Sequence, residues 1–353
     1  MGLGHSIIRY AFVPILCGVF GVILLTESLV DKTFSELALN KETTSVFHSD
    51  AGKKVHCGMG DDILGCVDGR SIDLLWLGNS QLHAINQIQD GIDKTALAEL
   101  YEHYRPLGLN VIGLSQPNAS LLEHQHILNY VLSKSDVGYL ILPLVYDDTR
   151  EGGVRKGLLP EDVSLQGQSE NDSDINNKNI LKPDELRKSV ENFLNETISG
   201  FIPIWAERSR VKAEIYSIAY KMRNFLLGIE PTSVRKKLLG PYKNNLRALN
   251  EMMETLERLQ IPSLVYIAPI RSDIKLPYDI DDYMEFKESA RRSLNKFSFA
   301  KYANFEHIVD NSLWGYKEST NLKPSAEVDF MHFQGPGHII LSEKVMEFMK
   351  NDI

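Results

Sequence analysis

Three residues of this chain have the types needed for nucleophilic chemistry: Ser80, Asp329 and His332. A serine attacks a carbonyl only when a neighbouring imidazole takes its proton, and an acid must hold that imidazole in the right tautomer. Ser80 ends the sequence LGNS near the start of the chain, whereas Asp329 and His332 lie three residues apart in DFMH near its end. Together they predict acyl chemistry through a Ser-His-Asp triad.

The residues around Ser80 predict a strand-to-helix turn. Ile72–Leu77 is largely apolar and typical of a buried strand, and Gln81–Gln89 follows it as an expected helix. A serine at such a turn lies at the carboxyl end of a parallel sheet, where unpaired amides and the helix dipole face developing negative charge. The alternative interpretation is that Ser80 only caps the helix.

The second pair of residues precedes the end of the chain. A Gly-Pro-Gly sequence follows His332, and a final amphipathic helix is expected at His338–Met349. This order, with serine after the first strand and Asp-x-x-His before the last helix, resembles the SGNH (GDSL-type) hydrolase superfamily. In that family the serine block is usually Gly-Asp-Ser, and this chain has Gly-Asn-Ser, a departure also found in its more distant branches. The resemblance implies a three-layer α/β/α flavodoxin-like fold with Ser80, Asp329 and His332 as the catalytic residues.

The family's oxyanion glycine should follow the second strand, expected at Leu109–Leu114. Gly113 and Ser115 are both candidates, because the alignment can be anchored either on the strand or on the PNAS sequence that follows it. Asn118, within PNAS, is a third candidate. The alternatives are that Gly113 is a close-packing residue and that Asn118 forms a turn.

A third strand, expected at Tyr139–Val145, ends in Tyr-Asp-Asp where the family typically carries Gly-x-Asn-Asp. Asp147 therefore stands where an asparagine would donate to the oxyanion. A carboxylate donates only when it is protonated, so an Asp147 in that position leaves the oxyanion hole incomplete or differently built. The alternative is that Asp147 is a solvated loop acid and another donor serves.

The amino-terminal segment predicts where the protein works. Ile7–Leu25 is almost wholly apolar, and about 20 such residues cross a bilayer core of roughly 30 Å. His5 and Arg9 lie at its start, and Glu27 and Asp31 follow it, so the positive-inside rule places the rest of the chain outside the cytoplasm. A cleaved signal peptide is the alternative, but no small-x-small cleavage site follows the apolar run.

Cys57 and Cys66 are the only cysteines beyond that segment. Glycines lie between them, so a short disulfide loop in an oxidising extracytoplasmic space is expected. Metal binding by His56 with both cysteines is the alternative, but a fourth ligand at the usual spacing is missing. No cofactor or metal is expected from the motifs of the chain.

The expected organisation has three parts: a signal anchor at 1–30, a linker at 31–70 and an SGNH-like domain at 71–353 with a helical insertion at about 148–259. Strands alternating with helices indicate a mainly parallel sheet covered on both faces. The insertion is expected to contain a polar mobile loop and helical candidates, and a fourth strand follows it. These segments are the loop Gln166–Lys178, the helices Pro183–Phe201, Ile204–Leu227 and Asn244–Gln260, and the strand Ser263–Pro269.

The charge of the chain bounds its partners. A net charge of −9 without a basic cluster argues against nucleic acid. Arg150, Arg155 and Lys156 could meet an anionic polymer, although scattered surface bases are the default interpretation.

An anchored extracytoplasmic domain with Asp-x-x-His followed by Gly-x-Gly-His is similar to proteins that modify cell-envelope polymers. These include the D-alanine transfer protein of teichoic acid and the O-acetylation proteins of bacterial exopolysaccharides. The resemblance implies a multi-pass membrane acyltransferase as partner, and acyl transfer to a polysaccharide or ester hydrolysis through Ser80. A catalytically silent module that binds polymer or scaffolds a membrane complex is the alternative, because Asp147 replaces the asparagine.

Overall fold

The computed structural model describes most of the chain from residue 71 onward. The described residues are 71–86, 94–116, 118–154, 218, 221–230, 232–317, 319–320, 322 and 326–353, with the backbone of 45–47 and 54–55. The chain divides into two compact units, residues 1–41 with 171–224 and residues 42–170 with 225–353. Few residues of the first unit are described, and the fold and site below belong to the second.

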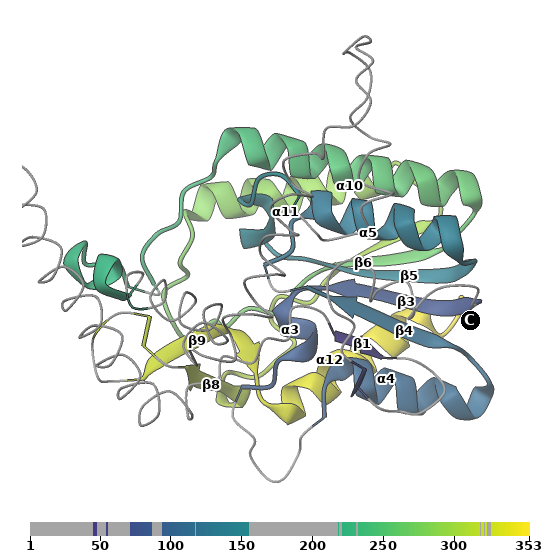
Figure 1. The fold of residues 1–353 in the computed structure, drawn as a ribbon, viewed down its shortest axis with the longest axis horizontal. Coiled ribbons are helices and arrows are strands. Elements are labelled where there is room, and N and C mark those ends of the chain that lie inside the picture. Colours follow the sequence, from purple (N-terminus) through teal and green to yellow (C-terminus); the bar gives the residue numbers. More distant parts are fainter. Residues whose placement is uncertain are drawn as a thin grey trace, which may run out of the picture. The chain divides into compact units, whose positions relative to one another are not determined.

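The second unit is an α/β structure built on a mainly parallel sheet (Figure 1). Its five parallel strands lie in the order β4-β3-β5-β6-β7. They are β3 (Ile72–Gly78), β4 (Val111–Ser115), β5 (Val137–Leu144), β6 (Ser263–Ile267) and β7 (Ala300–Asn304). The prediction of a mainly parallel α/β sheet is therefore confirmed, and the four predicted strands correspond to β3, β4, β5 and β6.

Two short strands extend the sheet beyond β4. β1 (Ser45–Phe47) pairs antiparallel with β4, and β2 (Lys54–Val55) pairs antiparallel with β1. Both fall within residues 31–70, the predicted linker. That segment therefore contributes the edge of the sheet. The sequence did not predict these strands, because the segment has no long apolar run.

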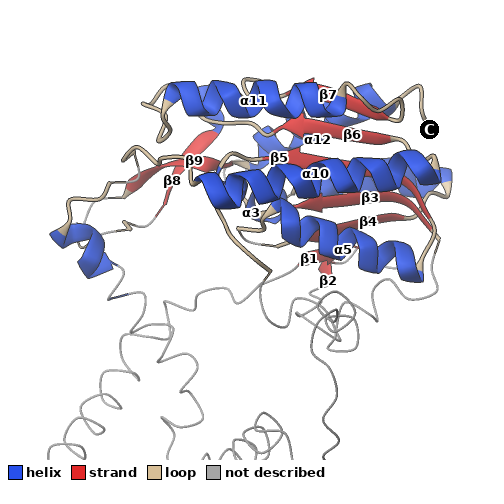
Figure 2. Cartoon of the chain, turned by 90° about the horizontal axis from the view of Figure 1, so that it is seen from above, coloured by secondary structure: helices blue, strands red, loops and turns tan. Residues whose placement is uncertain are grey.

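Helices cover both faces of the sheet (Figures 1 and 2). On one face, Leu75 and Leu77 of β3 belong to a core shared with α5, α10 and α11. On the other face, Leu74 and Trp76 belong to a core shared with α4 and α12. These helices are α4 (Ala96–Tyr104), α5 (Leu121–Lys134), α10 (Leu239–Leu259), α11 (Ile280–Leu294) and α12 (Gly335–Met349). A strand buried on both faces explains why Ile72–Leu77 is a nearly continuous apolar run.

The chain reverses its winding direction next to β3. It passes from β3 through α4 to the neighbouring β4, then through α5 back across β3 to β5 on the other side. Connections that diverge in this way leave a crevice at the carboxyl ends of the strands, where α/β proteins bind ligands. The residue that follows β3 is therefore placed at the edge where chemistry is expected.

The predicted helices Asn244–Gln260 and His338–Met349 correspond to α10 and α12, each of which begins earlier than expected. α10 forms the last part of the predicted insertion 148–259, yet Leu249 and Met252 of this helix belong to the core of the second unit. Of Ile204–Leu227, residues 218 and 221–227 are described; 218 and 221–226 are helical, and 227 lies in a turn. Pro183–Phe201 and the loop Gln166–Lys178 lie outside the described residues.

Candidate active site

Ser80 begins a short helix, α3 (Ser80–His83), directly after β3. The residue that caps this helix is Asn79, whose side-chain oxygen accepts a hydrogen bond of 3.0 Å from the amide of Gln81. The Asn79 Nδ2 donates to Asp148 Oδ2 at 3.0 Å, which fixes the turn to the end of β5. The capping role considered for Ser80 thus belongs to its neighbour. The Ser80 hydroxyl is left for other contacts.

The predicted helix Gln81–Gln89 is wrong in its length, because α3 ends at His83 and Ala84 has extended backbone angles. The chain leaves the helix to reach the strand β9 (Glu327–Phe333), where the Asn86 amide donates to the Phe333 carbonyl at 3.0 Å. Residues 87–89 lie outside the described residues. A long-range contact, which local propensity does not encode, ends the helix.

Ser80, His332 and Asp329 form one hydrogen-bonded line. The Ser80 Oγ lies 2.9 Å from His332 Nε2, and His332 Nδ1 lies 2.9 Å from Asp329 Oδ2. These are the contacts that a nucleophile, a base and an orienting acid require. The structure therefore brings together all three residues that the sequence selected, across a separation of about 250 positions.

Asp329 is buried and accepts several hydrogen bonds. Its Oδ1 accepts from the amides of Met331 and His332, at 2.9 and 3.1 Å. Its Oδ2 accepts from Asn86 Nδ2 at 2.8 Å, in addition to His332. Burial raises the pKa of Asp329, but the His332 hydrogen bond and charge, the Met331 amide and the Lys317 charge together lower this pKa to about 2. The acid is thus held ionised, as an orienting residue must be.

A bulge aims Asp329 and His332 at the serine. β9 pairs antiparallel with β8 (Trp314–Lys317), with Trp314 opposite Phe333 and Tyr316 opposite Val328. The residues between Val328 and Phe333 therefore lie opposite a single residue, Gly315. Asp329 and His332 are among these bulged residues. Such bulges redirect side chains out of a strand's regular alternation.

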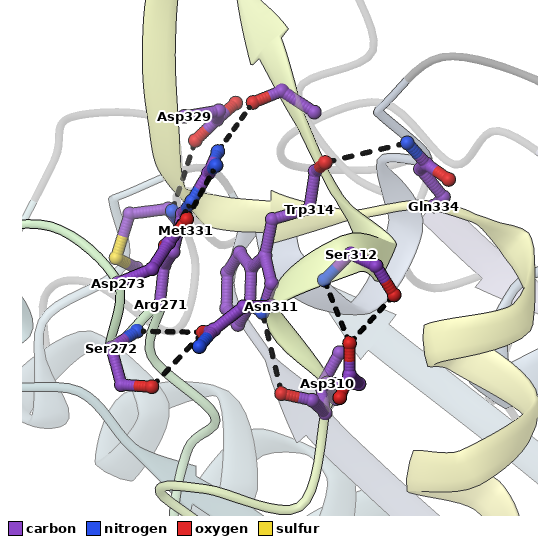
Figure 3. A network of polar contacts seen from close by, with 12 residues as sticks. Arg271, Ser272, Asp273, Asp310, Asn311, Ser312, Trp314, Asp329, Met331 and Gln334 are labelled. Atoms are coloured by element: carbon purple, nitrogen blue, oxygen red, sulfur yellow. Dashed lines mark hydrogen bonds and ion pairs between the residues drawn. The ribbon is translucent and has the colours of Figure 1, made fainter.

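Polar contacts at the base of this two-stranded arm hold it in place (Figure 3). Arg271 donates to the Gly315 carbonyl at 3.0 Å and makes two hydrogen bonds with Asp273, at 2.6 and 3.0 Å. Gln334 donates to the Trp314 carbonyl at 3.3 Å. Arg271 is buried, and its hydrogen bond anchors Gly315, the residue opposite the bulge.

Three residues that the sequence did not single out link the segment after β3 to neighbouring elements of the site, two of them to β9 and one to β4. Gln81 Nε2 donates to the Met331 carbonyl at 2.7 Å and to the Pro269 carbonyl at 2.9 Å. Asn86 contacts β9 through both its backbone and its side chain. His83 Nδ1 lies 2.7 Å from Ser115 Oγ. Their closeness to Ser80 along the chain was the only signal for Gln81 and His83.

Gly113 does not belong to the site. It lies inside β4 opposite Trp76, and a Cβ at this position would come within 2.0 Å of Leu97 Cδ2. Its role is therefore close packing against α4, which corrects its candidacy as the oxyanion glycine. Ser115 is at the carboxyl end of β4, opposite Gly78, and its hydroxyl reaches the first helix. Of these two candidates, Ser115 is the one at the edge of the sheet that carries Ser80.

Asn118 is exposed and has a φ of 52°, the left-handed conformation that asparagine tolerates in turns. Asp147 contacts Arg235 through Oδ2 and Arg150 through Oδ1, the latter at 3.4 Å, and accepts from the Tyr278 hydroxyl at 3.1 Å. An acid held by two guanidinium groups serves as an acceptor. Asp147 is therefore neither a solvated loop acid nor a donor to an oxyanion.

Asp148 is the acid that touches the nucleophile turn. Its carboxyl group is buried, and burial together with the charges of Asp147, Glu151 and Glu123 raises its pKa well above the usual value, although the Asn79 hydrogen bond opposes this. Asn79 and Asp148 thus form a buried polar pair at the ends of β3 and β5.

Among the described residues, no group of three or more His, Cys, Asp or Glu side chains is arranged to hold a metal ion. No helix in the described part of the chain has the length and apolar character to cross a bilayer. Ile7–Leu25, Cys57 and Cys66 lie outside the described residues. The membrane anchor and the disulfide remain predictions.

No protein-family model matches the chain. A comparison with curated proteins finds no match either.

Proposed function

We propose that this protein is a serine-dependent enzyme of the SGNH type that transfers an acyl group to, or removes one from, a cell-envelope or exported polysaccharide. The observation that carries the proposal is the hydrogen-bonded line Ser80-His332-Asp329 after the first strand of a mainly parallel sheet. The strand order, which read by position along the chain is 2-1-3-4-5 for the parallel strands, agrees with the flavodoxin-like fold implied by the resemblance.

In the proposed reaction, His332 Nε2 takes the proton of Ser80 as the hydroxyl oxygen attacks the carbonyl carbon of the acyl donor. Asp329, held ionised by its donors, stabilises the imidazolium that forms. The imidazolium then gives its proton to the leaving group, which leaves an acyl ester on Ser80. A sugar hydroxyl or water attacks this ester, and His332 acts again as base and then as acid.

The setting we propose follows from the amino-terminal sequence. Ile7–Leu25 anchors the chain in the cytoplasmic membrane, and the domain that carries the site lies outside the cytoplasm. A multi-pass membrane acyltransferase would then deliver the acyl group to Ser80.

A second candidate function is a catalytically silent module that binds polymer or scaffolds a membrane complex. Asp147 favours it, because this residue is held by Arg235 and Arg150 instead of offering a hydrogen-bond donor. In that case the triad geometry would persist without an activated serine.

Labelling of the full-length chain in nonionic detergent with a fluorophosphonate separates the two functions. The enzyme predicts one adduct, mapped to Ser80 by peptide mass spectrometry, that is lost in Ser80→Ala and His332→Ala. His103→Ala, which removes an exposed histidine of α4, is the matched control and should keep the adduct. Absence of an adduct on a folded protein would reject the enzyme and favour the scaffold.

A further inference from the structure

The proposed reaction places negative charge on the oxygen of the carbonyl that Ser80 attacks, and this oxyanion needs hydrogen-bond donors. The backbone supplies one, because the Ser80 amide opens α3 and has no acceptor within the described residues. Gly113 packs inside the sheet, and Asp147 is an acceptor bound by arginines. The Ser115 hydroxyl already has a partner, the Nδ1 of His83 at 2.7 Å. A second donor is therefore expected from another residue at this edge of the sheet.

Asp148 lies against the turn that carries the nucleophile. It follows β5, the strand paired with β3, and its Oδ2 and Oδ1 lie 3.0 and 3.4 Å from Asn79 Nδ2. Asn79 directly precedes Ser80, and its own side-chain oxygen caps α3. The carboxyl group of Asp148 is thus one side chain away from the backbone of the nucleophile.

The surroundings of Asp148 favour its neutral form. Its side chain is buried, and it forms no ion pair within the described residues. Burial raises the pKa of Asp148 well above the usual value, and although the Asn79 hydrogen bond opposes this, the charges of Asp147, Glu151 and Glu123 add to it. A carboxyl group that is buried beside other acids keeps its proton.

A neutral Asp148 has a hydrogen that lacks an acceptor in the described part of the chain. One carboxyl oxygen accepts from Asn79, and the other carries the proton and becomes a donor. The Asn79 Nδ2 is the one polar side-chain group that the described residues place against this carboxyl, and it is itself a donor. Such a hydrogen is poorly satisfied until an acceptor arrives, and a negatively charged oxygen is the acceptor that it binds most strongly.

We propose that Asp148 is a catalytic residue whose carboxyl O–H donates a hydrogen bond to the oxyanion formed at Ser80, together with the Ser80 amide. This role rests on the proposed function, because the oxyanion arises only in acyl transfer through Ser80. The proton stays on Asp148 throughout, and His332 alone moves a proton between the nucleophile and the leaving group. A carboxylic acid that its site keeps neutral can serve as an oxyanion donor in this way.

The rate of fluorophosphonate labelling tests the donor, because the phosphonyl oxygen takes the place of the oxyanion. The full-length chain in nonionic detergent is compared with two variants at Asp148. Asp148→Asn supplies a neutral N–H donor and an oxygen that accepts from Asn79, so labelling should stay within about threefold of the parent rate. Asp148→Ala removes the donor and should slow labelling by about 100- to 1,000-fold.

Infrared spectroscopy tests the proton itself, which a purely structural role for Asp148 would not require. The difference spectrum of the parent chain minus Asp148→Asn at neutral pH should contain the C=O stretch of a protonated carboxyl group. This band should shift when Ser80 is labelled, because the carboxyl hydrogen then meets the phosphonyl oxygen. Since Asp148→Asn keeps the hydrogen bond with Asn79, the comparison does not depend on whether Asp148→Ala folds.

Asp73→Asn is the matched control. Asp73 lies near the amino end of β3, and its Oδ2 accepts from the Asn110 amide at 2.6 Å, so this variant should keep the parent rate and the protonated-carboxyl band. A difference spectrum that contains only ionised-carboxylate bands would overturn the proposal, as would a band that labelling leaves unmoved. So would an Asp148→Ala protein that labels at the parent rate, or an Asp148→Asn protein that labels as slowly as Asp148→Ala.

The failure of this inference is distinguishable from that of the proposed function. A folded parent chain whose Ser80 does not react with the fluorophosphonate would reject the acyl transfer, and the role of Asp148 with it. A reactive Ser80 whose labelling rate does not depend on Asp148 would reject only the role of Asp148 and keep the acyl transfer.

Discussion

At the scale of single residues, the site depends on how completely Asp329 is held. Four donors converge on its two oxygens, from two backbone amides and the side chains of His332 and Asn86. The acid therefore has one orientation, and His332 Nδ1 carries the hydrogen that leaves Nε2 free to accept from Ser80. Asn86 is a positioning residue in this arrangement, because it touches the acid and no reacting atom.

Asn86→Ala should slow fluorophosphonate labelling of Ser80 by about tenfold, since it removes a charge-assisted hydrogen bond from Asp329. The labelling rate is measured by quenching the reaction at a series of times and determining the labelled fraction by intact-mass analysis. Asn250→Ala is the matched control, because the Asn250 amide donates only within α10, to the Leu246 carbonyl. Equal rates for the two variants would show that Asn86 does not position the acid.

At the scale of elements, the arm β8–β9 and the turn after β3 decide whether the triad forms. Neither element places its triad residues on a regular strand. Asp329 and His332 come from the bulge in β9, and Ser80 comes from the four-residue helix α3. Irregular backbone of this kind is fixed by side chains from elsewhere, and Arg271 and Gln81 provide that support.

Arg271→Met should slow labelling of Ser80 about tenfold, because the bulge loses its anchor at Gly315. Asp273, which loses its partner, is partly exposed and remains solvated, so the protein should still fold. Arg291→Met removes another arginine with two hydrogen bonds to one acid, Glu288, on the solvent-exposed side of α11, and should leave labelling unchanged. An unchanged rate in Arg271→Met would show that the arm is held by other contacts.

Gly113→Ala tests the packing role of that glycine. The added Cβ meets Leu97, so the free energy of unfolding in urea should fall by about 1–3 kcal/mol. Leu97→Ala in the same chain should recover part of that loss relative to the sum of the single effects. Gly240→Ala, at a position where a Cβ has open space, is the control. A stable Gly113→Ala protein with slow labelling would instead return Gly113 to the site.

At the scale of the whole molecule, His338 ties three elements together at the back of the site. Its Nδ1 accepts from the Ala96 amide of α4 at 3.2 Å, and its Nε2 lies 3.3 Å from the Ala84 carbonyl after α3, so the buried ring is a neutral Nε2–H tautomer. Burial lowers the pKa of His338 to about 3, although the Ala84 carbonyl opposes this. The histidine of Gly-x-Gly-His is therefore structural.

This pKa makes the molecule acid-sensitive in a defined range. The unfolded chain binds a proton at His338 below about pH 6.5, whereas the folded chain does so only near pH 3. The stability is thus fully present above pH 6.5 and falls by about 1.4 kcal/mol per pH unit below it. The pKa of Asp329 is also lowered, but over a more acidic range, so its contribution to stability is present above about pH 4 and is lost only as the pH falls toward 2.

His338→Gln should therefore flatten the pH dependence of the free energy of unfolding between pH 6 and 4.5, because glutamine supplies an acceptor and a donor without titrating. Urea unfolding followed by tryptophan fluorescence at these two pH values measures the slope. His103→Gln, an exposed histidine of α4, should keep the slope of the parent chain. A retained slope in His338→Gln would place the acid sensitivity elsewhere.

The sequence by itself determined the parts of this protein that depend on local pattern. The apolar runs of β3, β4, β5 and β6 and the Ser80 and Asp-x-x-His sequences were sufficient to predict a mainly parallel sheet and the three members of the triad. The short edge strands and β7 were not predicted, because a strand of three residues or one largely exposed to solvent has no apolar run. The sequence also left the role of Gly113 open, since a glycine needed for close packing and a glycine of an oxyanion site cannot be told apart by sequence.

Only the tertiary structure decided how the site is assembled. Asn86 and Arg271 act through residues far away in the chain, and no spacing rule connects them to Ser80. The end of α3, the bulge at Asp329 and the ion pairs of Asp147 are likewise set by contacts between segments. Such contacts depend on how elements pack, and packing is a property of the folded chain that a local pattern does not contain.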